Sequence, residues 1–216
     1  MSVKRKADGS RRTDIADAIL RVAGREGIGA LTMERVGREV GVTSGALFRH
    51  FPSRAAMLNE AARRAVALLE TTFPPADLAP LDRLRRFVTA RARLATAHTG
   101  IPQLVFSEQF GKALPPRGAL AVRGVVLRTR DFVVEALREA GARGEVRRDL
   151  SAEELALTLM GVIFARALFT VLDDAGRDSP PRHDSDAVWS HLLSLISSPE
   201  RRPANQPSWP IEGGPS

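Results

Sequence analysis

The segment Thr32–Phe51 reads TMERVGREVGVTSGALFRHF and carries the clearest structural signal in the 216-residue chain. The hydroxyl of its first residue can cap a helix over 33–40, because a threonine oxygen accepts hydrogen bonds from the backbone amides of a first turn. Gly41 supplies the left-handed residue that ends such a helix. Thr43 can then cap a second helix over 44–50. The segment therefore predicts two short helices joined by a tight turn.

The apolar residues of this segment fall on the inner side of both helices, and Gly37 lets the second helix approach the first closely. These apolar residues are Val36, Val40, Val42 and Leu47. Such a pair is typical of a helix-turn-helix, whose second helix enters the major groove of DNA. Between Ser44 and Arg49 the exposed face is small and polar except for the arginine, so it could approach base edges. Periodicity alone leaves an ordinary helical hairpin as the alternative.

The rest of the chain also predicts helices, because alternating β-branched runs are absent and Ala, Leu, Arg and Glu dominate. The fold class is therefore all-α. Residues 1–12 and 197–216 are expected to be disordered tails. The remaining expected helices span 14–26, 54–72, 81–96, 102–110, 118–140, 152–172 and 184–196.

Composition and charge narrow the function. The chain carries a net charge of +7, and its first 70 residues hold 13 Lys and Arg against 8 Asp and Glu. A basic terminal third suggests a polyanionic partner, although an arginine-rich surface that aids solubility is the alternative. Cysteine is absent, and no nucleophile elbow, phosphate-binding loop or metal-ligand spacing occurs. We therefore expect no enzyme, no cofactor, no metal site and no membrane span, in a cytoplasmic protein.

Residues 15–58 resemble the N-terminal DNA-binding domain of the tetracycline-repressor (TetR) family. Each matching piece is weak alone, and the combination is specific. Two positions depart from the family pattern: Phe48 replaces a tyrosine that donates its hydroxyl to a DNA phosphate, and Arg54 replaces a lysine at the start of the fourth helix. The matching pieces are Gly27–Thr32, Val40–Thr43, Leu47–Phe51 and Pro52–Leu58.

The resemblance implies a helix-turn-helix domain over 13–58 and an effector-binding and dimerisation domain over 59–196. It also implies a homodimer held by the helices at 152–172 and 184–196, bound to a palindromic operator in double-stranded DNA. A small effector would shift the dimer to a state that leaves the operator, as in a ligand-responsive repressor. The alternative is a helical adaptor or scaffold whose C-terminal half binds a protein partner.

Two sets of site residues follow from these interpretations. The candidates for DNA binding lie on the two short helices and the start of the next, where Arg54 could contact a phosphate. They are Thr32, Thr43, Ser44, Gly45, Ala46, Phe48, Arg49, His50 and Arg54. An effector pocket is expected among the middle helices, and an apolar ligand is favoured, although aromatic residues at helical spacing are more often plain core. Its candidates are Arg91, His98, Gln103, Leu104, Phe106, Glu108, Phe110, Phe132, Phe164 and Phe169.

Overall fold

The computed structural model describes residues 2–174 and 185–198, and this part of the chain folds into helices with one isolated β-bridge, between Val146 and Ser197. The all-α prediction is confirmed. No helix in the described ranges is both long enough and apolar enough to cross a membrane. The elements are α1 Ser2–Glu26, η1 Ile28–Ala30, α2 Met33–Val40, α3 Ser44–His50, α4 Arg54–Glu70, α5 Pro80–Ala97, α6 Gly100–Phe106, α7 Glu108–Ala113, α8 Pro116–Ala142, α9 Ala152–Asp174 and α10 Ser185–Ile196.

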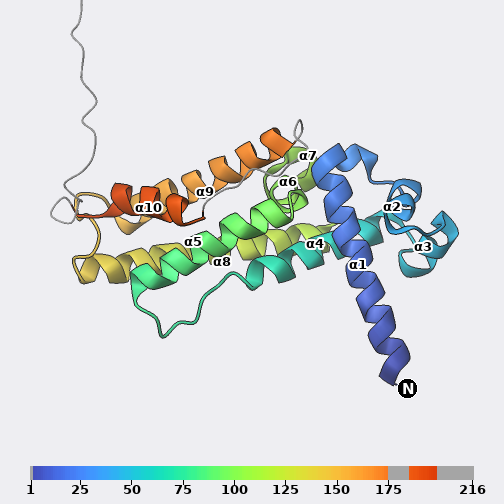
Figure 1. Cartoon of the computed structure of the whole chain (residues 1–216), viewed down its shortest axis with the longest axis horizontal. Helices are drawn as coiled ribbons and strands as arrows, with labels where there is room; N and C mark the ends of the chain where they lie inside the picture. The colour runs from blue at the N-terminus through green and yellow to red at the C-terminus, as the bar shows by residue number, and fades with distance from the viewer. Residues whose placement is uncertain (1, 175–184, 199–216) are drawn as a thin grey trace, which may run out of the picture.

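The helices form an elongated molecule with α2 and α3 at one end (Figure 1). Helices α4, α5, α8, α9 and α10 run along the long axis, and α1 crosses the end that carries the short helices (Figure 1). Helix α4 packs on both α1 and α8. It therefore connects the short helices to the long bundle.

Two apolar cores hold these helices together. The first core contains residues of the helices from α1 through α4, of α6 and α7, and of the start of α8, with Ile19, Leu47 and Leu104 among its side chains. The second joins α5, α8, α9 and α10 around Phe87 and Leu159. The first core continues through the boundary expected at residue 58, because α4 contributes apolar side chains along most of its length.

Two local expectations differ from the structure. Residues 2–12, expected to be a disordered tail, are the first turns of α1, which begins at Ser2; five of these residues are Lys or Arg, which are good helix formers, and the segment lacks proline. The helix expected over 102–110 is divided at Ser107, whose hydroxyl caps α7 by accepting from the Phe110 amide at 3.4 Å. Most of the loop expected after 172 and of the tail from 197 lies outside the described residues.

Part of the apolar side of α10 faces its own subunit, and the dimer contact expected for this helix stays a prediction. Val188, Leu192 and Ile196 are buried in the second core. Helix α9 exposes more large apolar side chains than any other described helix, with Leu157 75% exposed and Phe169 61% exposed, and α10 exposes Leu195 at 41%. An apolar stripe on a helix does not show by itself which neighbour covers it.

Candidate nucleic-acid interface and ligand pocket

The predicted helix-turn-helix forms as the sequence indicates, with each cap in place. The Thr32 hydroxyl accepts from the Arg35 amide at 3.0 Å, and the Thr43 hydroxyl accepts from the Ala46 amide at 3.2 Å. Gly41 lies between them in the left-handed conformation, with φ of 69°. These local interactions begin and end α2 and α3 at fixed residues, and so they fix the angle at which α3 leaves the turn.

Close packing holds α3 against α2. A Cβ atom on Gly37 would lie 2.8 Å from the carbonyl oxygen of Val42, so no larger residue fits without moving the turn. Val36 and Leu47 are fully buried between the helices. Because one side of α3 is fixed in the core, its other side is presented to solvent in a defined orientation.

A charged cluster ties α2 to α1. Arg35 donates to both Glu26 and Glu39, and Glu39 also accepts from Arg21 and from Arg25, at 2.6 Å for the latter. The hydrogen bond from Arg25 is the main cause that holds the pKa of Glu39 below its usual value, against the opposing effect of burial. The two acids offset most of the charge of the three arginines, so this cluster contributes less to attraction for a polyanion than unpaired arginines would.

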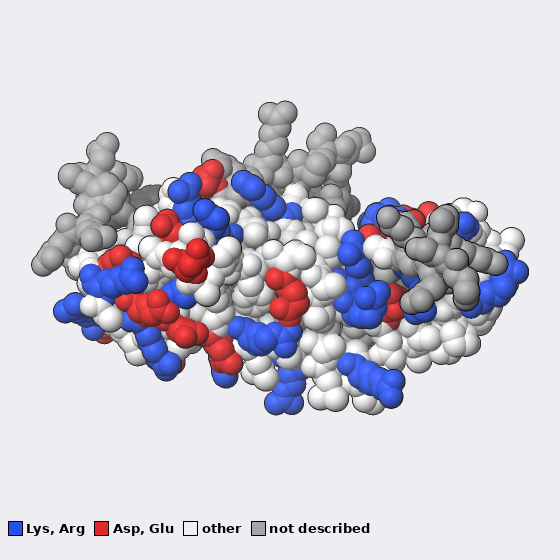
Figure 2. All heavy atoms as spheres, turned by 90° about the horizontal axis from the view of Figure 1, so that it is seen from below, with Lys and Arg blue, Asp and Glu red and all other residues white. Residues whose placement is uncertain are grey.

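The outward side of α3 is small, with one aromatic and one cation. Gly45, Phe48 and Arg49 are exposed, while Ser44, Ala46 and His50 are half-buried. Within the described part of the chain, no carboxylate pairs with Arg49 or with the exposed Arg38 of α2. Arg38 is not among the residues predicted from the sequence to bind DNA. It could have been found there, because it lies on the face of α2 opposite the apolar Val36. Figure 2 shows mainly basic side chains at the end that carries α2 and α3, and interleaved charges elsewhere.

Arg54 has a structural role that was not predicted from the sequence. Its Nε donates to the Leu31 carbonyl at 3.0 Å and its Nη2 donates to the Ile28 carbonyl at 2.9 Å. The guanidinium thereby holds η1 and the entry to α2 against α4. A lysine could not make this two-nitrogen contact. The phosphate contact expected at Arg54 stays a prediction, beside this positioning role.

Phe48 is the apolar side chain that α3 exposes most, at 50%. We expect Phe48→Tyr to strengthen operator binding slightly and to leave the preferred sequence unchanged, because the added hydroxyl can donate to a phosphate and phosphate contacts carry no sequence information. Binding measured against the operator and its single-base variants checks this result. A changed base preference would show that the ring reads a base edge.

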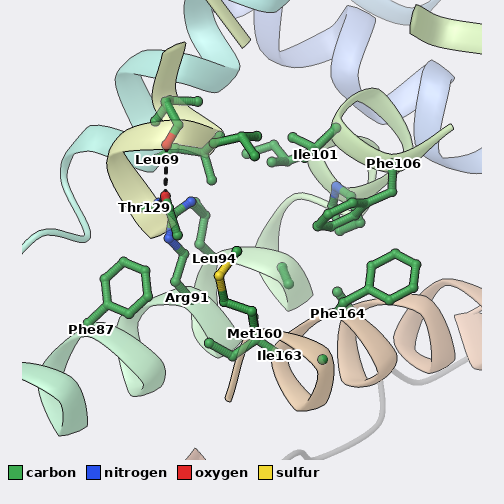
Figure 3. A pocket seen from close by; sticks show the side chains of 17 residues that line it. Leu69, Phe87, Arg91, Leu94, Ile101, Phe106, Thr129, Met160, Ile163 and Phe164 are labelled. Carbon is green, nitrogen blue, oxygen red and sulfur yellow. Dashed lines mark hydrogen bonds between the residues drawn. The ribbon is translucent and has the colours of Figure 1, made fainter. Parts of the chain in front are cut away.

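A cavity of about 290 Å³ lies among α4, α5, α6, α8 and α9, in the region where the effector pocket was expected. Among the 17 residues that line it, Arg91 and Thr129 alone carry polar side chains. Figure 3 shows these two residues near Phe87 at one end of the cavity, and Phe106 and Phe164 at the other. The rings of Phe106 and Phe164 pack edge to face with centroids 4.5 Å apart. Both are partly exposed, so this end reaches the surface.

The structure brings three of the predicted ligand residues to this cavity: Arg91, Phe106 and Phe164. The others lie elsewhere for identifiable reasons. Leu104 and Phe110 are buried in the first core, and Phe132 packs on Phe73 and Phe87. Glu108 pairs with Lys112 on the surface, and Phe169 is exposed. Gln103 does not line the cavity.

His98 also lies apart from the cavity, at the end of α5. Partial burial lowers the pKa of its imidazole, and the nearby carboxylate of Asp17 opposes this shift. Asp17 is itself held by Arg64 at 2.7 Å. His98 therefore belongs to the junction between α5 and α1.

The sequence reasoning missed most of the apolar lining. On α5 the spacing of Phe87, Arg91 and Leu94 places them on one helical face, and this spacing was the available signal. Thr129 of α8 and Met160 of α9 complete the walls. Nothing in their local sequence distinguishes them from core residues, because the cavity exists only where five helices meet.

Helix α6 lies between this cavity and α1. Its residues Ile101, Val105 and Phe106 line the cavity. At its other end a Cβ on Gly100 would lie 1.8 Å from the carbonyl oxygen of Leu20, so the backbones of α6 and α1 touch. A change in the cavity that displaces α6 would therefore press directly on the helix that supports α2.

Comparison with known proteins identifies the N-terminal domain. Residues 15–61 match the sequence profile described as bacterial regulatory proteins, tetR family. Among curated protein sequences, none matches this chain. The resemblance in the sequence is thereby confirmed for the domain that carries α2 and α3.

Solved structures share the fold over nearly the whole chain. The ketosteroid transcriptional regulator KstR2 of Mycobacterium tuberculosis has a TM-score of 0.72 at 18% identity, over 87% of this chain and 95% of its own. AibR, in complex with isovaleryl coenzyme A and operator DNA, has a TM-score of 0.70 at 14% identity, over 87% and 98%. A protein of Saccharomonospora viridis, described as a transcriptional regulator and solved with choline, has 0.67 at 22%, over 88% and 99%.

Proposed function

The chain belongs to the tetR family of bacterial regulatory proteins, and from this premise we propose that it is a homodimeric transcriptional repressor released from a palindromic operator by a small-molecule effector. We place the DNA-binding domain at 13–58 and the effector-binding and dimerisation domain at 59–196, with α4 and the first core continuous across this boundary. The neighbours described above include one solved with operator DNA and an acyl coenzyme A and one solved with choline, which supports a protein that takes both kinds of partner.

The outward face of α3 is the observation that carries the proposal. Gly45, Phe48 and Arg49 are exposed on this face, the small Ser44 and Ala46 are half-buried, and α2 fixes its orientation. A helix presented in this way fits the major groove of B-DNA, where side chains reach base edges. Backbone amides at the caps of α2 and α3 add contacts to phosphate.

Dimerisation is supported by the surface of α9. Leu157, Gly161, Phe164 and Leu168 recur at spacings of four, three and four along this helix, and all four are exposed. Such a seam suits a second copy of the same helix related by a two-fold axis. Phe164 belongs both to this seam and to the cavity wall, so effector binding and subunit packing share a side chain.

Release of the operator follows from a shift between two arrangements of the dimer. One arrangement sets the two α3 helices about 34–36 Å apart, to match successive major grooves. An effector that binds the other arrangement more tightly shifts the population away from the arrangement that fits DNA. The contact between α6 and α1 provides a direct route for this shift, because α6 lines the cavity and its first residue abuts α1.

We also infer that the protein has no catalytic role. The family is one of transcriptional regulators, and we infer that this chain is not an enzyme and acts without a cofactor, in the cytoplasm where its DNA lies. Its pocket then serves to sense a ligand. A helical adaptor, the alternative class, would need neither an oriented α3 nor an apolar cavity.

Selection of random double-stranded DNA by the full-length protein, followed by sequencing, tests the function. We expect enrichment of one inverted repeat. We expect Arg49→Ala to weaken binding of that sequence by about 1–3 kcal/mol if the guanidinium reads a base. Arg93→Ala is the matched control, because Arg93 is an exposed arginine of α5, far from α3. Equal binding by wild-type protein and Arg49→Ala would remove this residue from the interface.

A further inference from the structure

Arg91 lines the cavity, and no carboxylate of the described residues pairs with its guanidinium. Arg91 and Arg83 both lie on α5, and the Nε atom of each is buried without a hydrogen-bond partner. Arg83 pairs with the carboxylate of Glu139. For Arg91, within the described residues, the hydrogen-bond acceptor is the Thr129 hydroxyl at 2.9 Å. Among the residues that the structure describes, Arg83 therefore has a carboxylate partner and Arg91 has none.

Thr129 has little further capacity to satisfy this cation. Its hydroxyl donates to the Val125 carbonyl at 2.8 Å while it accepts from Arg91. The negative charge of Glu70 acts to raise the pKa of Arg91, but the Glu70 carboxylate itself pairs with Arg128. A guanidinium has five N–H donors, and the bond to Thr129 uses one of those of Arg91, so the group has unused donors although its Nε is buried.

The surroundings of Arg91 keep it charged. Its guanidinium carbon lies 4.9 Å from the ring centroid of Phe87 and 5.5 Å from that of Phe73. Each ring face attracts a cation without accepting a conventional hydrogen bond. Burial lowers the pKa of Arg91 to about 10, which leaves the side chain protonated at neutral pH. The cavity thus contains one positively charged side chain among apolar walls.

We propose, on the basis of the sensing role above, that the effector is an apolar carboxylate whose anionic end pairs with Arg91 and whose hydrocarbon body fills the cavity toward Phe106 and Phe164. Arginine binds carboxylates through two parallel hydrogen bonds, and pairing removes the cost of an isolated buried charge. The cavity volume of about 290 Å³ matches roughly ten non-hydrogen atoms, at about 30 Å³ each, the volume of a water molecule. A medium-chain fatty acid meets both requirements.

Calorimetric titration of the DNA-free dimer with octanoate and with 1-octanol tests the charge. The two probes have the same hydrocarbon chain and differ in the head group. We expect octanoate to bind wild-type protein about 10- to 100-fold more tightly than 1-octanol, the range for hydrogen bonds to a charged partner. A series from butanoate to dodecanoate should reach its optimum near octanoate.

Matched variants assign the preference to one residue. Arg91→Met keeps an unbranched apolar stem and removes the guanidinium; we expect it to lose the preference for octanoate and to bind 1-octanol at least as well as wild-type protein does. It should fold, because replacing a buried unpaired charge with an apolar group is seldom destabilising. Arg93→Met, on the exposed side of the same helix, should behave as wild type. Equal binding of the two probes, binding of neither, or a preference retained by Arg91→Met overturns the proposal.

A separate titration of the operator complex distinguishes this proposal from the function on which it rests. Octanoate that binds through Arg91 but leaves the operator complex intact would support the ligand class and contradict release by that ligand. Release by 1-octanol as readily as by octanoate would support a ligand-responsive repressor and overturn the carboxylate.

Discussion

A Leu157→Glu variant is expected to be a folded monomer that has lost specific operator binding. Leu157 is 75% exposed on α9, so a glutamate there is solvated in the isolated subunit. In the proposed dimer the same side chain would be buried at the seam, where an unpaired charge costs about 3–5 kcal/mol. One subunit contacts few base pairs, so its residual attraction to DNA should be weak and sensitive to salt. Sedimentation and operator binding, measured on the same sample, check this result.

Two matched leucine variants separate the seam from other causes. Leu192→Glu places the charge in the core of the subunit, where Leu192 is fully buried, and we expect it to unfold the long bundle. Leu120→Glu adds the same charge at a 69% exposed site on α8, and we expect a dimer that binds the operator. A dimeric Leu157→Glu protein would show that the subunits meet through another surface.

A Gly100→Ala variant is expected to lower stability by about 3 kcal/mol or more, at the upper end of overpacking effects. The added methyl group would lie 1.8 Å from the Leu20 carbonyl oxygen, and a backbone atom cannot move aside as a flexible side chain can. Helix α6 must therefore separate from α1. For a chain of this size the loss corresponds to a fall in melting temperature of about 6–12 °C, which calorimetry would detect.

The matched glycine is Gly111 of α7, where a Cβ meets no atom within 4 Å. Gly111→Ala should leave stability unchanged or raise it slightly, because alanine favours the helix. The two variants also test the route from cavity to DNA. A Gly100→Ala protein that folds should show a weakened effect of effector on operator binding. Unchanged stability and an unchanged effector response in Gly100→Ala would rule out α6 as that route.

Local chemistry made the helix-turn-helix predictable from the sequence. The caps at Thr32 and Thr43 and the left-handed Gly41 each depend on residues within one turn of the chain, and all were confirmed. The match of 15–61 to a family profile has the same origin, since a compact motif keeps its signal within a short stretch. Arg54 is the exception, because its acceptors lie more than 20 residues earlier.

The cavity and the seam could be predicted only in part. Their residues come from helices far apart in the chain, and an apolar residue carries no mark of the neighbour that will cover it. Phe106 and Phe110 lie in adjacent short helices, yet the first lines the cavity and the second fills a core, because the break at Ser107 turns α7 away. Arg91 was identifiable as a polar residue among apolar ones. Its lack of an acidic partner could not be known without the fold.

The measurement that tests the dimeric DNA-binding mechanism most directly is the affinity of the full-length protein for its selected operator and for the same operator with five base pairs inserted between the half-sites. Five base pairs turn one half-site by about half a helical turn, since B-DNA repeats every 10–10.5 base pairs. The two α3 helices of one dimer could then no longer occupy both half-sites from the same side of the duplex. We predict that affinity falls to that of a single half-site. Unchanged affinity for the lengthened operator would contradict the account.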